Sequence, residues 1–174
     1  NAFNTAEVCK YAHSKGVSVE AELGHVGNAS VGSISETGLD VDPGESLTVP
    51  EEVKKFVEIT DVDALAVAIG NAHGNYPMLP ELRFDVLEEI YKATDIPLVL
   101  HGGTGITAEM FRKAISLGIR KINIATASFD AVAKASKQTA ESNGNYFALS
   151  QNMADAVYEN VKKHIKIFNM EKLK

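Results

Sequence analysis

The sequence has little cysteine, no excess of positive charge and no long apolar run. Its single cysteine, Cys9, excludes a disulfide framework and makes a reducing cytoplasm the expected compartment. The formal net charge of −6 argues against a nucleic-acid or anionic-membrane surface. No apolar stretch approaches the roughly 18–20 residues of a membrane helix, and no basic-then-apolar leader is present, so neither a membrane span nor secretion is expected.

What the chain does contain is an alternation of strand and helix patterns. With 174 residues, of which 45% are hydrophobic, we expect one domain over residues 1–174. Short apolar runs predict strands at Val17–Leu23, Ala64–Ile69, Pro97–Leu100 and Lys121–Ile124. Apolar periodicity and capping residues predict helices at 5–15, from Pro50, around 84–91, from Thr107 to Gly118, at 128–141 and at 152–168.

The start of the chain and one long connection need separate comment. Asn4 and Glu7 have the spacing of a capping box, so the chain is expected to open with a helix that no strand precedes. We therefore expect a piece of a longer protein. The glycine- and serine-rich stretch Gly24–Glu45 is predicted to be a functional or mobile loop.

Four nearly all-apolar strands that alternate with helices predict an α/β protein with a parallel sheet. Four such units make half of a (β/α)₈ TIM barrel, and a small flavodoxin-like sheet is the alternative. Right-handed crossovers would bring the carboxyl ends of all strands to one edge.

Polar side chains stand at each of these four strand ends: Glu22, His73, His101 and Asn123. A polar residue that ends an apolar run is costly unless it is paired, so four in succession favour a site. Two imidazoles and a carboxylate suit zinc or another divalent ion. The third ligand is either Glu22 or a residue outside these segments. His13 and His164 are expected to be exposed, and Cys9 to pack in the core.

Glycine-rich segments follow the last two strands, where barrels favour phosphate sites. Gly102-Gly103-Thr104-Gly105 and Asn123-Ile124-Ala125-Thr126 offer backbone N–H groups and hydroxyls to an anion. Lys121 is placed at a strand start, so a Schiff-base lysine is not expected.

Several of these segments together resemble the class II, zinc-dependent aldolases, a family that includes the fructose-bisphosphate and tagatose-bisphosphate enzymes. The resemblance is carried by the segments Val19–Gly24, Ala66–Gly74, Pro97–Gly105 and Lys121–Thr126. It implies a (β/α)₈ barrel of which this chain is the second half. It also implies a cytoplasmic homo-oligomer in carbohydrate metabolism or glycolysis.

The resemblance also implies roles for individual residues. His73 and His101 match two zinc ligands, and Glu22 matches a carboxylate that binds metal in an alternative position. The positions that match those holding dihydroxyacetone phosphate are Gly74, Gly102, Gly103, Thr104, Asn123 and Thr126. Of these, Asn123 would contact the oxygen of the reacting carbon. The family's catalytic aspartate and remaining ligand lie in an Asp-His-Gly segment, which does not occur in this sequence.

The expected function is therefore metal-dependent cleavage of a ketose 1-phosphate or ketose bisphosphate to dihydroxyacetone phosphate and an aldehyde. Zn²⁺ or another divalent metal is the expected cofactor, with room for a monovalent cation. The segment Gly24–Ser30 departs from the glycolytic pattern and resembles sugar-catabolic members instead. The alternatives are a metal-free phosphosugar isomerase or epimerase barrel and a non-catalytic half-barrel module. By itself, the chain is expected to be inactive.

Overall fold

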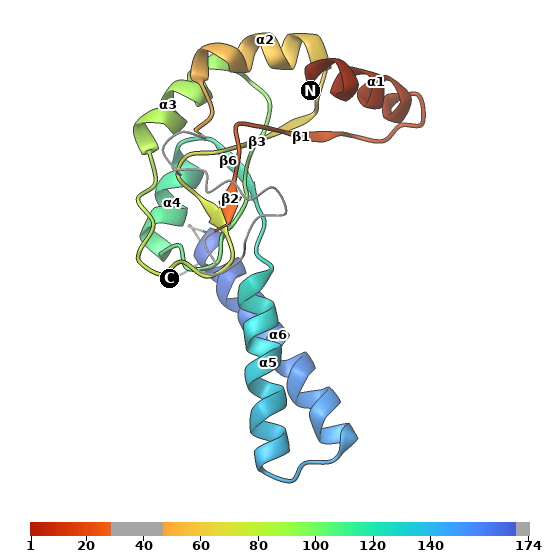
Figure 1. The fold of residues 1–174 in the computed structure, drawn as a ribbon, viewed down its shortest axis with the longest axis vertical. Helices are drawn as coiled ribbons and strands as arrows, with labels where there is room; N and C mark the ends of the chain where they lie inside the picture. Colours follow the sequence, from red (N-terminus) through yellow and green to blue (C-terminus); the bar gives the residue numbers. More distant parts are fainter. Residues whose placement is uncertain (29–46, 170–174) are drawn as a thin grey trace.

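The computed structural model describes residues 1–28 and 47–169 and has an α/β architecture (Figure 1). Its helices are α1 (Ala2–His13), α2 (Pro50–Thr60), α3 (Phe84–Ala93), α4 (Ala108–Ser116), α5 (Thr126–Glu141) and α6 (Tyr146–Phe168). Its strands are β1 (Glu20–Leu23), β2 (Gly27–Asn28), β3 (Ala64–Val67), β4 (Ala72–His73), β5 (Leu98–Leu100) and β6 (Ile119–Ile122).

Four strands form one parallel sheet in the order β1-β3-β5-β6. The order in space is the order along the chain, so each βα unit adds to the same edge. A barrel is built in this way, whereas a doubly wound sheet reverses direction at a switch point. The predicted parallel sheet is thus confirmed, and its order favours the half-barrel over the flavodoxin-like alternative. The short strands β2 and β4 pair in parallel beside it.

The two faces of the four-stranded sheet differ in chemistry. On the outer face, fully buried strand residues join a core with apolar residues of α2, α3 and α4. These strand residues are Leu65, Val67, Leu98, Leu100 and Ile119. The inner face instead carries Glu20, Glu22 and Lys121 above the small or β-branched residues Ala66 and Val99. Because side chains alternate along a strand, this division follows from the register.

Local signals place several helices correctly. Pro50 opens α2 with Glu51 and Glu52 in its first turn. Thr107 caps α4, where its hydroxyl accepts a hydrogen bond from the Met110 N–H. Cys9 is buried in the core, as predicted.

Some predicted boundaries are wrong. The Asn4–Glu7 capping box does not form, because α1 begins at Ala2 and encloses Asn4; the Thr5 N–H already bonds the Asn1 carbonyl. Helix α6 begins at Tyr146 instead of residue 152, because the Asn145 side chain caps it by accepting from the Ala148 N–H. Strands β1, β3 and β5 are also shorter than predicted, and β6 has the predicted length but lies two residues earlier in the chain.

Helices α5 and α6 form a hairpin that projects from the sheet (Figure 1). Side-chain bonds from Asn152 to Thr139 and from Asn160 to Ser128 hold the two helices together. Near the C-terminal end of α6, Phe168 packs edge-on against Phe111 of α4. None of the helices within the described ranges is long and apolar enough to cross a membrane. Most of the predicted loop Gly24–Glu45 lies outside the described residues.

Candidate metal and phosphate site

The two predicted histidine ligands lie close together at the carboxyl edge of the sheet. His73 ends β4 and His101 directly follows β5, and their ring centroids are 5.8 Å apart. His73 is exposed and His101 is partly buried. The structure therefore brings together two imidazoles that the sequence separates by 28 positions.

Two polar side chains connect the segments that carry these histidines. The Asn71 side chain accepts from the Ile69 N–H at 2.8 Å and donates to the His101 carbonyl at 3.1 Å. The Tyr76 hydroxyl accepts from the Ala72 N–H at 2.7 Å and donates to the Gly102 carbonyl at 3.1 Å. Burial raises the pKa of Tyr76, so the hydroxyl stays protonated as a donor.

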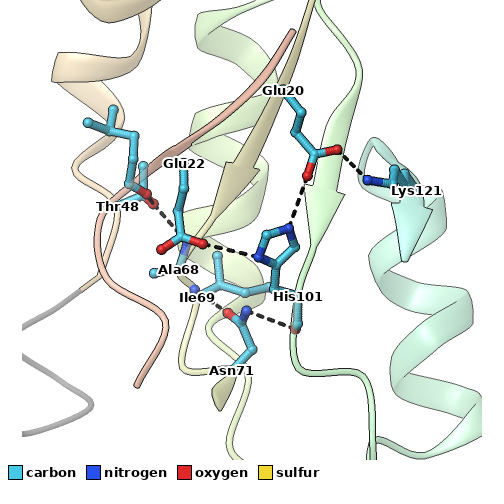
Figure 2. Close-up of polar contacts among 9 residues, drawn as sticks. Glu20, Glu22, Thr48, Ala68, Ile69, Asn71, His101 and Lys121 are labelled. Carbon is cyan, nitrogen blue, oxygen red and sulfur yellow. Dashed lines mark hydrogen bonds and ion pairs between the residues drawn. The ribbon is translucent and has the colours of Figure 1, made fainter. Parts of the chain in front are cut away.

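His101 contacts two carboxylates from β1 (Figure 2). Its Nε2 lies 3.0 Å from Oε1 of Glu20, and its Nδ1 lies 3.1 Å from Oε2 of Glu22. Glu22 is therefore placed beside a predicted metal ligand, as the sequence suggested. Glu20 is a further partner that the sequence reasoning missed.

Glu20 is also bound to Lys121, whose Nζ lies 2.6 Å from its second carboxylate oxygen. Burial alone would raise the pKa of Glu20, but the hydrogen bonds from Lys121 and His101 outweigh it and lower that pKa. The carboxylate is thus held ionised. The signal for both residues was in the sequence: Glu20 stands two positions before Glu22, and Lys121 two before Asn123, on the same strand faces.

The donor set fits zinc in its chemistry, with two imidazoles and a carboxylate. A neutral imidazole has one N–H, so when Nε2 of His101 donates to Glu20, Nδ1 turns its lone pair toward Glu22. A lone pair beside a carboxylate oxygen is an arrangement that a divalent cation would stabilise. Within residues 1–28 and 47–169, however, no three His, Cys, Asp or Glu side chains converge closely enough to hold a metal ion. By themselves, these residues therefore do not form a complete metal site.

The glycine-rich segment after β5 packs tightly. A Cβ on Gly102, where φ is +65°, would lie 2.1 Å from the Ala72 carbonyl oxygen, so this position requires glycine. The Gly103 N–H already donates to the Asn123 carbonyl at 3.1 Å. The expectation of an open N–H for phosphate is wrong at Gly103, because the pairing of β5 with β6 continues past the strand ends.

Three of the predicted phosphate-binding residues, Thr104, Asn123 and Thr126, nevertheless lie in or next to the segment that joins β6 to α5. The side chain of Asn123 is exposed just beyond β6, and Thr126 begins α5. Thr104 is buried, and its hydroxyl accepts from the Ala127 N–H in the first turn of α5 at 3.0 Å. Gly74 follows β4 with φ of +90°. At this helix end the N–H groups of Ala127, Ser128 and Phe129 are already bonded, the first to the Thr104 hydroxyl and the other two to the Ala125 carbonyl.

The remaining histidines differ from expectation. His13, predicted to be exposed, is only partly exposed because it contacts Asp63 and Asp61. His164 was predicted to be solvated, but it packs against Phe111 and Phe168 and its Nδ1 lies 2.8 Å from the Asn160 carbonyl oxygen. Phe168 lies one turn later in α6, but Phe111 comes from α4, a contact that sequence periodicity within α6 cannot reveal.

Comparison with known proteins identifies the family model that this chain matches. The model for class II fructose-bisphosphate aldolase matches residues 1–172. The uncharacterized protein YdjI of Escherichia coli K12 is 41% identical over 167 residues, covering 96% of this chain and 57% of the relative. Fructose-bisphosphate aldolase of Staphylococcus aureus Mu50 is 40% identical over 171 residues, covering 97% and 57%. The chain thus spans little more than half the length of these relatives.

Solved structures agree with this match. The crystal structure of the YdjI aldolase superposes with a TM-score of 0.80 at 37% identity, over 97% of this chain and 55% of that one. A candidate fructose-1,6-biphosphate aldolase from Coccidioides immitis gives 0.85 at 31% identity, over 97% and 58%. The predicted resemblance to the second half of such a barrel agrees with this partial coverage.

Proposed function

Since the chain belongs to the class II fructose-bisphosphate aldolase family, we propose that the protein carrying it is a metal-dependent aldolase. It cleaves a ketose 1-phosphate or ketose bisphosphate to dihydroxyacetone phosphate and an aldehyde. The observation that carries this proposal is that His101 lies beside His73 and also beside Glu22 at the carboxyl edge of the sheet. In barrels of this kind, active sites lie at that edge.

Each group of residues has a separate task in the proposed reaction. His73, His101 and Glu22 would supply part of the ligand set of a zinc ion, together with the family's Asp-His-Gly segment; when bound, the ion acts as a Lewis acid on the ketose carbonyl. Asn123 is exposed just past β6, where it would hold the oxygen of the reacting carbon. The hydroxyl groups of Thr104 and Thr126, beside the first turn of α5, would hold the phosphate. Binding the phosphate would orient the reacting end of the sugar.

The reaction balances as a retro-aldol cleavage. A base takes the proton of the C4 hydroxyl, the C3–C4 bond breaks, and the C4 oxygen becomes the aldehyde oxygen. The electron pair of the broken bond stays on the three-carbon fragment, which takes a proton at C3 to give dihydroxyacetone phosphate. We assign the base to the family's Asp-His-Gly segment, which is not among these 174 residues. For that reason we propose that the isolated chain does not catalyse cleavage.

The sugar is proposed to be a catabolic ketose 1-phosphate in preference to a glycolytic bisphosphate. The support is the segment Gly24–Ser30, which departs from the glycolytic pattern; Ala29 and Ser30 lie outside the described residues. We further propose a cytoplasmic homo-oligomer, on the basis of the single cysteine and the family resemblance.

The test uses the complete protein that carries this chain. Purified protein is depleted of metal with a chelator, reloaded with Zn²⁺, Mn²⁺, Co²⁺ or none, and supplied with a panel of ketose 1-phosphates and bisphosphates. Dihydroxyacetone phosphate is measured by coupled NADH oxidation. We expect product only in metal-loaded samples, with the highest kcat/KM for a 1-phosphate. Full activity after metal removal, or isomerisation without carbon–carbon cleavage, would contradict the proposal.

A further inference from the structure

We propose that Glu20 and Lys121 are a positioning pair that fixes the orientation and tautomer of the His101 ring. The inference rests on the proposed function, because it concerns how a metal ligand at that site is held. The pair acts through His101 and is assigned no contact with substrate. In this role Glu20 accepts a hydrogen bond from the Nε2–H of His101, and Lys121 holds Glu20 in place.

The contacts that carry the proposal join β1, the end of β5 and β6, across the intervening strand β3 (Figure 2). Glu20 on β1 uses one carboxylate oxygen for His101 Nε2, at 3.0 Å, and the other for Lys121 Nζ on β6, at 2.6 Å. With both oxygens engaged, the carboxylate has a defined orientation. The side chains of His101 and Glu20 are 18% and 26% exposed, so solvent competes only partly for these bonds.

The intervening strand leaves room for this contact. Between β1 and β5 lies β3, whose residues Ala64 and Ala66 pair in register with Glu20 and Glu22. Parallel partners in register point to the same face, so alanine is what the inner face of β3 presents here. A larger side chain at Ala66, which is fully buried, would occupy the space through which Glu20 approaches His101.

A β-bulge places Lys121 on the correct face. Leu98 pairs with Ile119 but Val99 pairs with Lys121, so Arg120 is an extra residue in β6. Without the bulge, Lys121 would pair with Leu100 and point into the apolar core beneath the helices, where an ammonium group is costly. The irregularity therefore has a consequence at the site: it presents the Lys121 ammonium to Glu20.

The tautomer follows from this geometry. A histidine that binds a metal through one nitrogen commonly donates its other N–H to a carboxylate, which fixes the ring. Here the carboxylate on the Nε2 side is fixed by a lysine, whereas Glu22 on the Nδ1 side has no lysine contact among the described residues. Glu20 is thus the fixed acceptor, and Nδ1 remains available toward Glu22.

The test compares Glu20→Gln, Glu20→Leu and Lys121→Met in the complete protein, with Lys121→Arg as a rescue variant. Glu89→Gln, which breaks a surface contact with Lys92 on α3, is the matched control. The readouts are zinc affinity by competition with a chelating dye and the ¹⁵N shifts of the His101 ring in the metal-free protein. The kcat and KM of each variant complete the set.

We expect Glu20→Gln and Glu20→Leu to weaken zinc binding about 10–100-fold and to lower kcat more than they raise KM. The His101 ¹⁵N shifts should move from a dominant Nε2–H form toward a mixture. Lys121→Met should weaken zinc binding less than the Glu20 variants do, and Lys121→Arg should bind zinc as the wild type does. Combined with Glu20→Gln, Lys121→Met should weaken zinc binding little further, because both substitutions act through one carboxylate.

Unchanged zinc affinity and unchanged ¹⁵N shifts in Glu20→Gln would overturn the positioning role while leaving the proposed aldolase function intact. If Glu20→Leu failed to fold, Glu20→Gln, which keeps the shape of the side chain, would still decide the question. Conversely, if the wild-type protein bound no zinc and cleaved no sugar, the proposed function would fail. The tautomer shift in Glu20→Gln would then still test the pair by itself.

Discussion

Two histidine–carboxylate clusters lie at opposite ends of the same sheet. At the amino end, Nε2 of His13 lies 2.9 Å from Asp63 and Nδ1 lies 3.5 Å from Asp61. At the carboxyl end, His101 has almost the same arrangement, with Glu20 and Glu22 at 3.0 and 3.1 Å. Each imidazole thus has one carboxylate near each nitrogen.

What differs is what surrounds each cluster. Asp63 also accepts a hydrogen bond from the Val19 N–H, so the His13 cluster ties the end of α1 to the start of β1. His101 instead faces His73 and is followed by the glycine-rich segment whose Thr104 bonds the first turn of α5. A contact between histidine and carboxylate therefore does not by itself mark a site. The position of the His101 contact at the carboxyl edge of a parallel sheet is what marks it, because active sites in such barrels lie at that edge.

The largest expected effect is the difference in metal content and activity between variants of His101 and His13. His101→Ala should remove bound metal from the complete protein and abolish formation of dihydroxyacetone phosphate without unfolding it. His13→Gln, at the other end of the sheet, should leave both unchanged. Metal content per protomer, the coupled assay and circular dichroism measure these outcomes. Normal zinc content and activity in His101→Ala would mean that the metal site lies elsewhere.

Thr104→Val tests whether Thr104, at the carboxyl edge of the sheet, binds the phosphate of the substrate. Loss of a charge-assisted hydrogen bond should raise KM by the equivalent of about 1.5–3 kcal/mol. Because Thr104 also accepts from the Ala127 N–H, stability should fall by about 1 kcal/mol, as for a lost helix cap. Thr104→Ser keeps the hydroxyl and should restore both. An unchanged KM in Thr104→Val would place the phosphate elsewhere and leave Thr104 a purely structural role.

Tyr76→Phe examines how the two histidine-bearing segments are held. The lost hydroxyl leaves the Ala72 N–H and the Gly102 carbonyl without this partner, which should cost about 1–3 kcal/mol in urea unfolding. Tyr146→Phe is the control, since that side chain is largely exposed on the projecting hairpin. Equal stability of the two variants would show that the segments are held by other contacts.

The smallest effect is expected at the amino end and depends on pH. A hydrogen bond to Asp63 raises the pKa of His13 above 6.5, so its stabilisation is full below that value and fades as pH rises through the folded pKa. Hydrogen bonds from Val19 and then His13 lower the pKa of Asp63 below 3.8, so its stabilisation is present above that value and fades in acid.

His13→Gln should therefore lower Tm most between about pH 4 and 6.5, and the difference from wild type should shrink toward pH 8. Thermal unfolding followed by circular dichroism across this range measures it. A difference in Tm that stays constant from pH 5 to 8 would show that His13 acts through packing, without its charge.

Most of the secondary structure could be predicted because its signals are local. Pro50 and Thr107 specify helix starts through backbone geometry and a capping hydroxyl, and both starts were placed correctly. The predicted start of α6 is too late because the true start is marked only by the capping side chain of Asn145. The Asn4–Glu7 pattern failed for the converse reason, since a helix that starts earlier encloses it.

The sequence by itself determined which polar residues end the strands and, through the repeated apolar runs, that these ends share one edge. His101 and Glu22 could be paired in advance for that reason. Only the tertiary structure decided that Glu20 also reaches His101 across an intervening strand, and that a bulge at Arg120 brings Lys121 to Glu20. Strand alternation fixes the face of a side chain within its own strand, whereas register between strands is set by long-range pairing and packing.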